Sequence, residues 1–181
     1  VFSESNPRSI IYSTIALCRH GEKSLTSRVL DQLGQVSFES LELTDRLALL
    51  RAYSLCFIRL NQATIEEKNT VIAKLDSFYP AQNESLNTEL SRVLGYLDSP
   101  NVVKKTIGLM KRTETKTLAY DKEMLERSEY GRDILNTMSN TPNSQNIHYA
   151  YSLRQTQNGW TLEDRKYYFS WLNETLEKSC H

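Results

Sequence analysis

Apolar residues recur along most of the chain at spacings of three and four, the period of a helix that buries one face. In the clearest case, between 84 and 97, one helical face carries Leu86, Leu90, Val93, Leu94 and Leu97. A sustained period of two, which is typical of half-buried strands, does not occur. The chain has only six glycines and four prolines. The pattern therefore predicts an all-α fold.

The predicted helices form pairs, each consisting of a helix, a short polar turn and a second helix. Four pairs are expected, at 8–20 with 24–33, 43–60 with 64–78, 84–97 with 99–112, and 144–154 with 161–177. Leu30, Ile72 and Ile107, at equivalent positions of second helices, lie 42 and 35 residues apart, within the loose period of two-helix repeats. We therefore expect a tandem array within a single domain over 1–181.

Several helix starts are predicted by their capping residues. Thr64 with Glu67, and Thr161 with Asp164, match the capping box, in which each residue satisfies a free backbone donor of the other. Ser99 is expected to cap the next helix, with Pro100 in its first position. The helix over 43–60 is expected to be covered on both sides because it has two stripes, one of Leu43, Leu47, Leu50 and Ser54 and the other of Leu49, Ala52, Cys56 and Leu60.

A charged segment, 113–141, interrupts the array before its last pair. Ten of the residues from 114 to 133 are charged, yet a thin apolar stripe remains, made of Tyr120, Met124, Leu125, Ile134, Leu135 and Met138. We predict a solvated helix with a kink at Gly131, and a disordered linker is the alternative. If the segment protrudes, it is a candidate contact surface, to which Tyr120 and Arg127 belong.

Aromatic residues are concentrated in GWTLEDRKYYFSWL, residues 159–172. Helical spacing places on one face, which we expect to be mostly core, Leu162, Phe169, Leu172 and Leu176, with Tyr168 and Trp171 beside them and Tyr167 further round. Trp160 is expected to fold onto the first helical turn as a staple. The alternative is a carbohydrate-binding or enzymatic groove that uses Trp160, Tyr167, Trp171 and His148.

The charge balance and the cysteines narrow the class of protein. Lys plus Arg and Asp plus Glu both number 22, so no net field attracts nucleic acid, and no nucleic-acid partner is predicted. The most apolar run, 47–60, contains two arginines and is shorter than the roughly 20 residues of a membrane span. We therefore predict no membrane span. Cys18 and Cys56 lie in apolar helical patterns and are expected to be buried free thiols rather than a disulfide.

Candidate catalytic chemistry is sparse. His20, His148 and His181 lack a partner at the i+3 or i+4 spacing of a helical metal site, so no metal is predicted. The common signatures of nucleotide, ester, peptide and calcium chemistry do not occur. The sequence thus favours a protein that is not an enzyme, holds no cofactor and binds another protein.

Two levels of resemblance follow from these patterns. The stretch LSRVLGYLDSPNVVKKTIGLMKR, residues 90–112, resembles a HEAT repeat. A longer succession is similar to the HEAT-repeat segment of large exported bacterial proteins that join a β-propeller, dehydrogenase-like domain to a c-type cytochrome domain. It covers nearly the whole chain and consists of KSLTSRVLDQL, RLALLRAYSLCFIRLN, VIAKLDSFYP, NTELSRVLGYLDSPNVVKKTIGLM, IHYAYSLR and GWTLEDRKYYFSWLN.

The resemblance implies a right-handed α-α superhelix of the HEAT and ARM type, with about four helix pairs, inside a longer polypeptide in the periplasm or outside the cell. Redox chemistry would belong to neighbouring domains, because EKSCH has Glu177 where a haem-attaching Cys-x-x-Cys-His needs its first cysteine. The leading hypothesis is a non-catalytic scaffold or interaction module, with another domain of the same polypeptide or an unknown protein as partner. A cytosolic HEAT-like adaptor is a further alternative.

Overall fold

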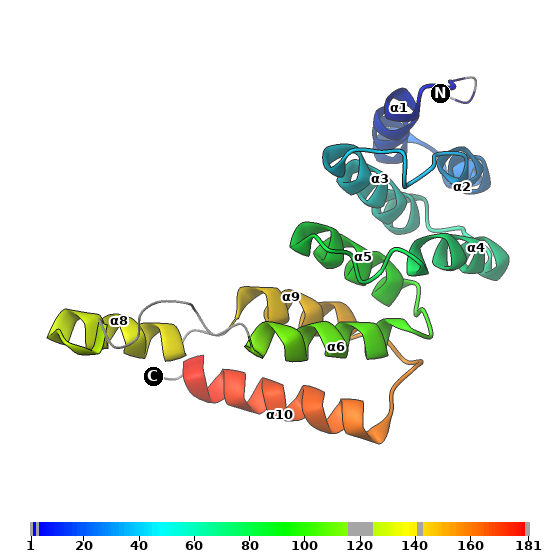
Figure 1. The fold of residues 1–181 in the computed structure, drawn as a ribbon. Coiled ribbons are helices and arrows are strands. Elements are labelled where there is room, and N and C mark those ends of the chain that lie inside the picture. The colour runs from blue at the N-terminus through cyan, green and yellow to red at the C-terminus, as the bar shows by residue number, and fades with distance from the viewer. Residues whose placement is uncertain (1, 3, 116–124, 141–142, 180–181) are drawn as a thin grey trace. The chain divides into compact units, whose positions relative to one another are not determined.

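A computed structural model describes residue 2 and residues 4–115, 125–140 and 143–179 (Figure 1). Every regular element in these ranges is helical, which confirms the predicted all-α class. The chain divides into two compact units, Val1–Ser99 and Pro100–His181. Each unit has its own buried core, and the two are described separately below.

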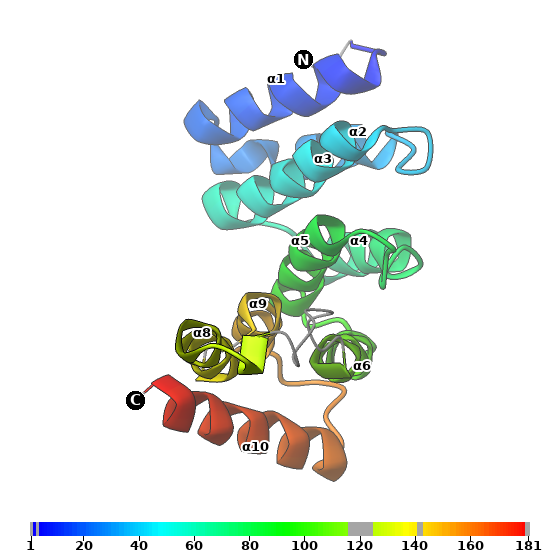
Figure 2. The ribbon, with the colours of Figure 1, turned by 60° about the vertical axis from the view of Figure 1, so that its left-hand side comes forward.

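The first unit contains two layers of helices. Its elements are α1 (Pro7–His20), the 3₁₀ turn η1 (Lys23–Leu25), α2 (Thr26–Gly34), α3 (Leu43–Leu55), the π-helical turn η2 (Cys56–Leu60), α4 (Ile65–Asp76) and α5 (Glu84–Tyr96). One layer consists of α1, α3 and α5, with α3 between the other two, and α2 packs against α4 in the second layer (Figure 2). The prediction that the helix after Leu43 is covered on both sides is therefore confirmed.

The apolar stripes predicted for this unit form its core. Leu49, Leu50 and Leu60 are fully buried, and all five residues of the stripe from Leu86 to Leu97 are buried. Burial of a side chain of this size contributes about 1.5–3 kcal/mol of transfer free energy, so these stripes supply much of what holds the layers together. One predicted stripe of α3 is buried only in part: Leu43 lies in the first turn and is exposed, and Leu47 and Ser54 are half-buried.

The capping box predicted at the start of α4 is confirmed. The Thr64 amide donates to Glu67 Oε2 at 2.7 Å, and the Glu67 amide donates to Thr64 Oγ1 at 3.2 Å. Two free amide donors at the helix start are thereby satisfied by side chains.

The predicted start of the following helix is wrong. Ser99 does not cap a helix that has Pro100 in its first position, because α6 begins at Val102. Instead Ser99 completes the end of α5: Asp98 has a φ of 57°, its amide donates to the Gly95 carbonyl, and the Ser99 amide donates to the Leu94 carbonyl at 3.0 Å. This is the Schellman arrangement, which satisfies carbonyls that the helix leaves without partners.

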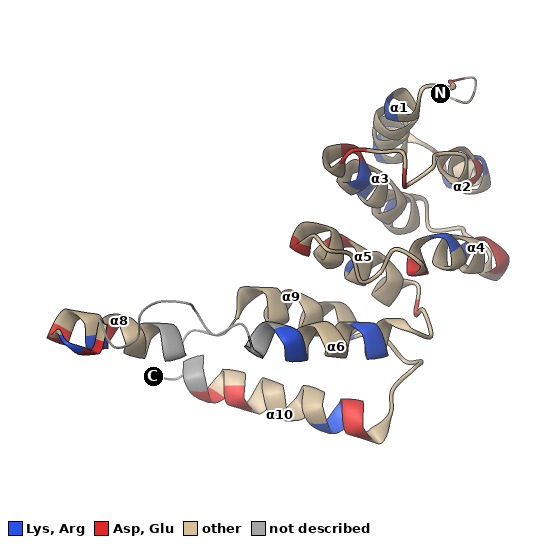
Figure 3. Ribbon diagram, viewed as in Figure 1, with Lys and Arg blue, Asp and Glu red and all other residues tan. Residues whose placement is uncertain are grey.

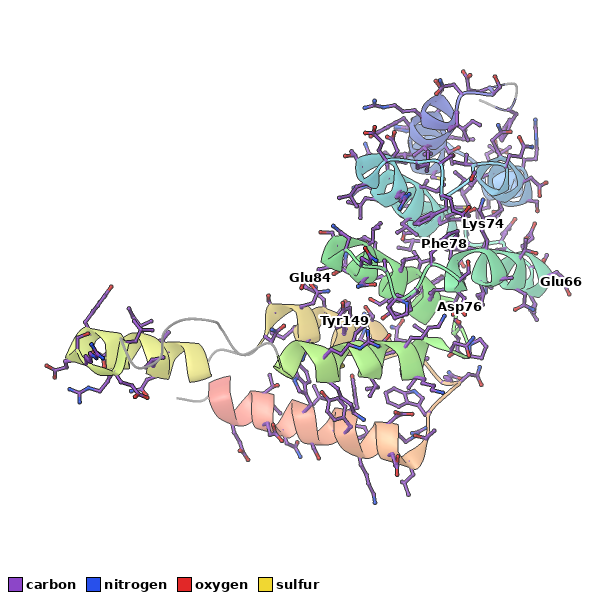
Figure 4. The ribbon with its side chains drawn as sticks, in the orientation of Figure 1. Glu66, Lys74, Asp76, Phe78, Glu84 and Tyr149 are labelled. Carbon is purple, nitrogen blue, oxygen red and sulfur yellow. The ribbon has the colours of Figure 1, made fainter. Side chains whose placement is uncertain are left out.

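A lysine joins the second helices of the first two pairs. Lys74 extends from α4 toward the carboxyl end of α2 (Figure 4), where its ammonium group donates to the carbonyls of Leu33, Gly34 and Val36 at 3.3, 2.7 and 2.7 Å. Cations are favoured at helix carboxyl ends because the last carbonyls carry partial negative charge. Burial lowers the pKa of Lys74 from its ordinary value.

The second unit contains α6 (Val102–Thr115), α8 (Glu129–Asn140), α9 (Ser144–Leu153) and α10 (Leu162–Ser179). Helix α6 packs against both α9 and α10. The side chains buried in this unit include Val103, Ile107 and Met110 of α6 and Tyr149 and Leu153 of α9. The buried Asn146 amide also donates to the Met110 carbonyl at 3.2 Å, which ties α9 to α6 by a polar contact.

The described part of the charged segment contains a helix, α8, which covers 129–140. The predicted kink at Gly131 is not found there. The turn comes earlier, at Arg127 and Ser128, and the Ser128 hydroxyl accepts a hydrogen bond from the Gly131 amide at 2.9 Å. The Leu125 carbonyl approaches Gly131 so closely that a β-carbon would overlap it, which explains a glycine at this position. Tyr120 and Met124 lie outside the described residues.

Candidate interaction surface

One side of α10 forms part of the core of the second unit. Tyr168 and Trp171 are only 8% and 7% exposed, and the Tyr168 hydroxyl donates to the Ala150 carbonyl of α9 at 3.0 Å. Burial raises the pKa of Tyr168, partly offset by the charge of Arg154. Two large aromatic rings on this side bury more area than aliphatic side chains would, and the phenol has a partner for its polar end.

A neighbouring side of α10 corrects the sequence prediction, and it adjoins the buried side because the Phe169 ring meets the Tyr168 ring edge to face with centroids 5.5 Å apart. Leu162, Phe169 and Leu176, predicted as core, are 70%, 58% and 62% exposed. We call these three residues the outer stripe. The helix is apolar on two sides, and the side with Tyr168 and Trp171 is the one that packs within this unit. Spacing alone does not decide which of two apolar stripes is buried.

Trp160 folds back onto the start of α10, as predicted. Its indole Nε1 donates to the Thr156 carbonyl at 2.9 Å, and its ring meets Tyr168 edge to face with centroids 5.3 Å apart. The Arg165 guanidinium carbon lies over the indole ring, 5.7 Å from the ring centroid. The adjacent capping box is also confirmed, since Asp164 accepts from the Thr161 amide at 3.3 Å and Thr161 accepts from the Asp164 amide at 3.1 Å. The indole thus fixes the entry into α10.

The remaining predicted site residues differ in their exposure. Tyr167 is partly exposed, with the Lys111 ammonium 4.9 Å from its ring centroid. His148 of α9 and Arg127 are exposed, whereas Trp171 is buried. Tyr120 lies outside the described residues. A groove lined by Trp160, Tyr167, Trp171 and His148 would need Trp171 at the surface. The Trp171 side chain is buried, so it does not line such a groove.

Charged residues border the outer stripe. Arg165 and Lys166 are exposed in the first half of α10, and Glu174 and Glu177 are exposed in the second half. Figure 3 shows acidic positions at the start of α10, where Glu163 and Asp164 lie in the first turn, then basic positions, and acidic positions again towards its end. An apolar stripe with a charged border has the composition of a helix–helix contact, in which the apolar centre excludes water and the border stays solvated.

The outer stripe has a signal in the sequence, and it is the kind of pattern that predicted a doubly covered helix at 43–60. The two stripes between Leu43 and Leu60 predicted a helix covered on both sides. The same criterion applied to 162–176 indicates two apolar sides of α10. Within its unit only one of them is buried.

Neither metal-binding nor membrane-spanning features are present in the described ranges. No three His, Cys, Asp or Glu side chains there lie together as a metal site would require. Within the same residues, no helix combines the length and the apolar character that crossing a bilayer demands.

Comparison of the chain with protein-family models, with curated proteins and with solved structures gives no match.

Proposed function

We propose that this chain is a non-catalytic helical-repeat module of the HEAT-like type, and that it binds a helical segment of protein through the outer stripe of α10. The single observation that carries the proposal is the exposure of Leu162, Phe169 and Leu176 on a helix whose other side is buried. The stacked layers of the first unit support it, because each pair there buries an apolar stripe against its neighbours.

The expected occupant is an amphipathic helix. The precedent lies in the same chain: α3 also has two apolar sides, and each receives a helix, α1 on one side and α5 on the other. The outer stripe repeats at seven-residue intervals from Leu162 to Leu176, which suits a partner with the same helical period. Exposed apolar side chains in a row mark interaction sites because leaving them in water costs free energy.

The resemblance to exported redox proteins supports a location for such a module. We propose that the module belongs to a larger protein of the periplasm or cell exterior, in which other domains perform redox chemistry and one of them supplies the helix. The alternative is a cytosolic HEAT-like adaptor. The flanking gene sequence separates the two: a signal peptide upstream and Cys-x-x-Cys-His downstream support export, and the absence of both removes it.

Site-specific photo-crosslinking tests the surface. A photoreactive amino acid is placed at Phe169 in the complete polypeptide encoded by the gene, and cross-linked peptides are identified by mass spectrometry. We expect a cross-link to a helical segment outside 162–176. The matched control is the same photoreactive residue at Ser170, which is exposed but lies off the outer stripe. Equal or absent cross-linking at both positions would show that the stripe faces water.

A saccharide-binding unit is the second candidate, because Trp160 and Tyr167 remain partly exposed. Saccharide binding that is lost in Trp160→Ala but kept in Phe169→Glu would favour it over the helix-binding role.

A further inference from the structure

The continuous helix formed by α3 and η2 is covered on three sides. It packs against α1 and α5 within its own layer and against α2 of the second layer. One side therefore remains free, and the residues that stay exposed after the first turn of α3 lie on it. These residues are Arg51, Ile58 and Arg59, and the Ile58 side chain is 63% exposed.

The π-helical turn holds the last two of these residues on an ordered piece of backbone. Cys56, Phe57 and Leu60 are buried, and Cys56 is a free thiol, as predicted. The Asn61 amide closes the turn by donating to the Cys56 carbonyl at 3.3 Å. Asn61 has a φ of 47°, the left-handed conformation that asparagine tolerates and that commonly ends helices. Widened helical turns of this kind are frequent at functional sites.

A tyrosine of the neighbouring helix α5 extends the free side. The Tyr96 hydroxyl donates to the Phe57 carbonyl at 3.5 Å, and the centroids of the two rings lie 6.2 Å apart. This contact places Tyr96, which is 48% exposed, beside the residues that follow Phe57. We call the four exposed residues the arginine patch: Arg51, Ile58, Arg59 and Tyr96.

The arginine patch carries positive charge without a local counter-charge. No Asp or Glu occurs between 46 and 65. Within the described part of the chain, neither Arg51 nor Arg59 has a hydrogen bond or an ion pair through its side chain. On α5, the Glu89 carboxylate is already paired with the Arg92 guanidinium at 3.0 Å. The patch is therefore open to a negatively charged partner.

The helix itself accounts for only one of the two arginines. Arg59 lies in the last turn of η2, where the free carbonyls of a helix end favour a cation. Arg51 lies in the middle of α3, where no helix end is near and no carboxylate pairs with it. Its position next to an exposed isoleucine and an exposed tyrosine is what a binding surface requires.

We propose that the arginine patch binds an acidic peptide segment of another protein, in which carboxylates stand on either side of an apolar residue. A guanidinium group forms two parallel hydrogen bonds with a carboxylate, which suits Arg51 and Arg59. Ile58 and the ring of Tyr96 offer the apolar residue of the peptide a contact that excludes water. Arginine and tyrosine are among the residues that contribute most to binding energy in protein interfaces.

A nucleic acid suits this surface less well than a peptide. Binding to a phosphate backbone gains from many cations spread along a face, and the chain has equal numbers of basic and acidic residues. The exposed Ile58 also gains from an apolar partner, which a phosphate backbone does not provide. The arginine patch belongs to the first unit, so this inference is independent of the role proposed for α10.

Selection from a display library of random short peptides tests the proposal. The 181-residue chain is immobilised, and bound peptides are eluted and sequenced. The same selection is made on the double variant Arg51→Glu, Arg59→Glu. We expect the unmodified chain to enrich peptides in which Asp or Glu flanks Leu, Ile or Phe, and the double variant to enrich none of them, because its carboxylates repel those of the peptide.

The enriched peptide is then synthesised with a fluorophore, and its Kd is measured by fluorescence anisotropy. Arg51→Ala, Arg59→Ala and Ile58→Ser should each raise the Kd roughly fivefold or more. The matched control is Arg132→Ala, which removes an exposed arginine of α8 and should leave the Kd unchanged. Far-UV circular dichroism of each variant shows that its helices are intact.

Three results would overturn the proposal. One is a selection that enriches no acidic peptides, and another is equal binding of the enriched peptide by the double variant. The third is a fluorescent single-stranded oligonucleotide that binds as tightly as the peptide and is lost in the same arginine variants, because the patch would then be a general anion surface.

Discussion

At the residue scale, buried and half-buried polar side chains connect segments that the apolar stripes leave unspecified. The amide of Asn87 both donates to and accepts from Ala81, at 2.9 and 2.7 Å, and so fixes the loop before α5. Lys74 does the same for the end of α2. Neither contact was predicted, because asparagine and lysine at these positions are compatible with a solvated helix face. Their partners are backbone carbonyls and amides, which no sequence pattern marks.

Lys74→Met tests the weight of the lysine contact. Methionine preserves the length and apolar stem of the side chain but removes the ammonium group that donates to the carbonyls of Leu33, Gly34 and Val36. Hydrogen bonds to a charged group contribute about 1.5–3 kcal/mol, so we expect a loss of that order in the free energy of unfolding. Urea denaturation followed by far-UV circular dichroism measures it. Lys23→Met, at an exposed position, should change it by less than about 0.5 kcal/mol.

At the element scale, the start of α4 depends on an ionised Glu67. Its pKa is lowered by a hydrogen bond from the Ser27 side chain and then by the Thr64 amide. Because the folded-state pKa lies below the unfolded one, the stabilisation is fully present above the ordinary glutamate pKa. It is lost as the pH falls through the folded-state value.

Glu67→Gln should therefore reduce the acid dependence of stability. Glutamine still accepts at the capping box but does not titrate, so we expect a weaker fall in the urea midpoint between neutral and acidic pH than in the unmodified protein. Glu66→Gln is the matched control, because Glu66 is an exposed neighbour in the same turn (Figure 4). Identical pH profiles for Glu67→Gln and the unmodified protein would contradict the assigned contribution.

The comparison of α3 with α10 shows what a helical period can and cannot predict. The sequence identified two apolar stripes for α3, whereas for α10 it predicted one mostly buried face. For α3 the covering helices are α1 and α5. For α10 the choice between the stripe of Tyr168 and Trp171 and the outer stripe depends on tertiary contacts, which include the hydrogen bond from the Tyr168 hydroxyl to Ala150 and the ring contact of Tyr168 with Trp160. The capping boxes were predictable because donor and acceptor lie three residues apart.

At the scale of the whole molecule, the order of helices was predictable and the grouping of helices was not. Every helix of the predicted pairs has its counterpart among α1 to α10, because caps and apolar stripes are local features. The division between Ser99 and Pro100 falls inside the predicted pair 84–97 with 99–112. That division depends on which cores are contiguous, a long-range property that local spacing does not contain.

The two cores predict a separable unfolding behaviour that the tryptophans make measurable. Both tryptophans, Trp160 and Trp171, belong to the second unit, so their fluorescence reports that unit, whereas far-UV circular dichroism reports both. Leu90 is fully buried in the first unit, and Leu90→Ala should cost it about 2–5 kcal/mol. We expect the variant to lower the urea midpoint of the dichroism transition while the fluorescence midpoint stays unchanged.

Met110→Ala is the counterpart in the second unit, where Met110 is fully buried. It should lower the fluorescence midpoint, because the cavity opens in the core that contains Trp171. The fluorescence midpoint would then change in Met110→Ala and not in Leu90→Ala. This contrast does not depend on how much free energy of unfolding either variant loses. Coincident shifts of both probes in both variants would mean that the chain unfolds as one cooperative body, and the separate cores would then have no thermodynamic counterpart.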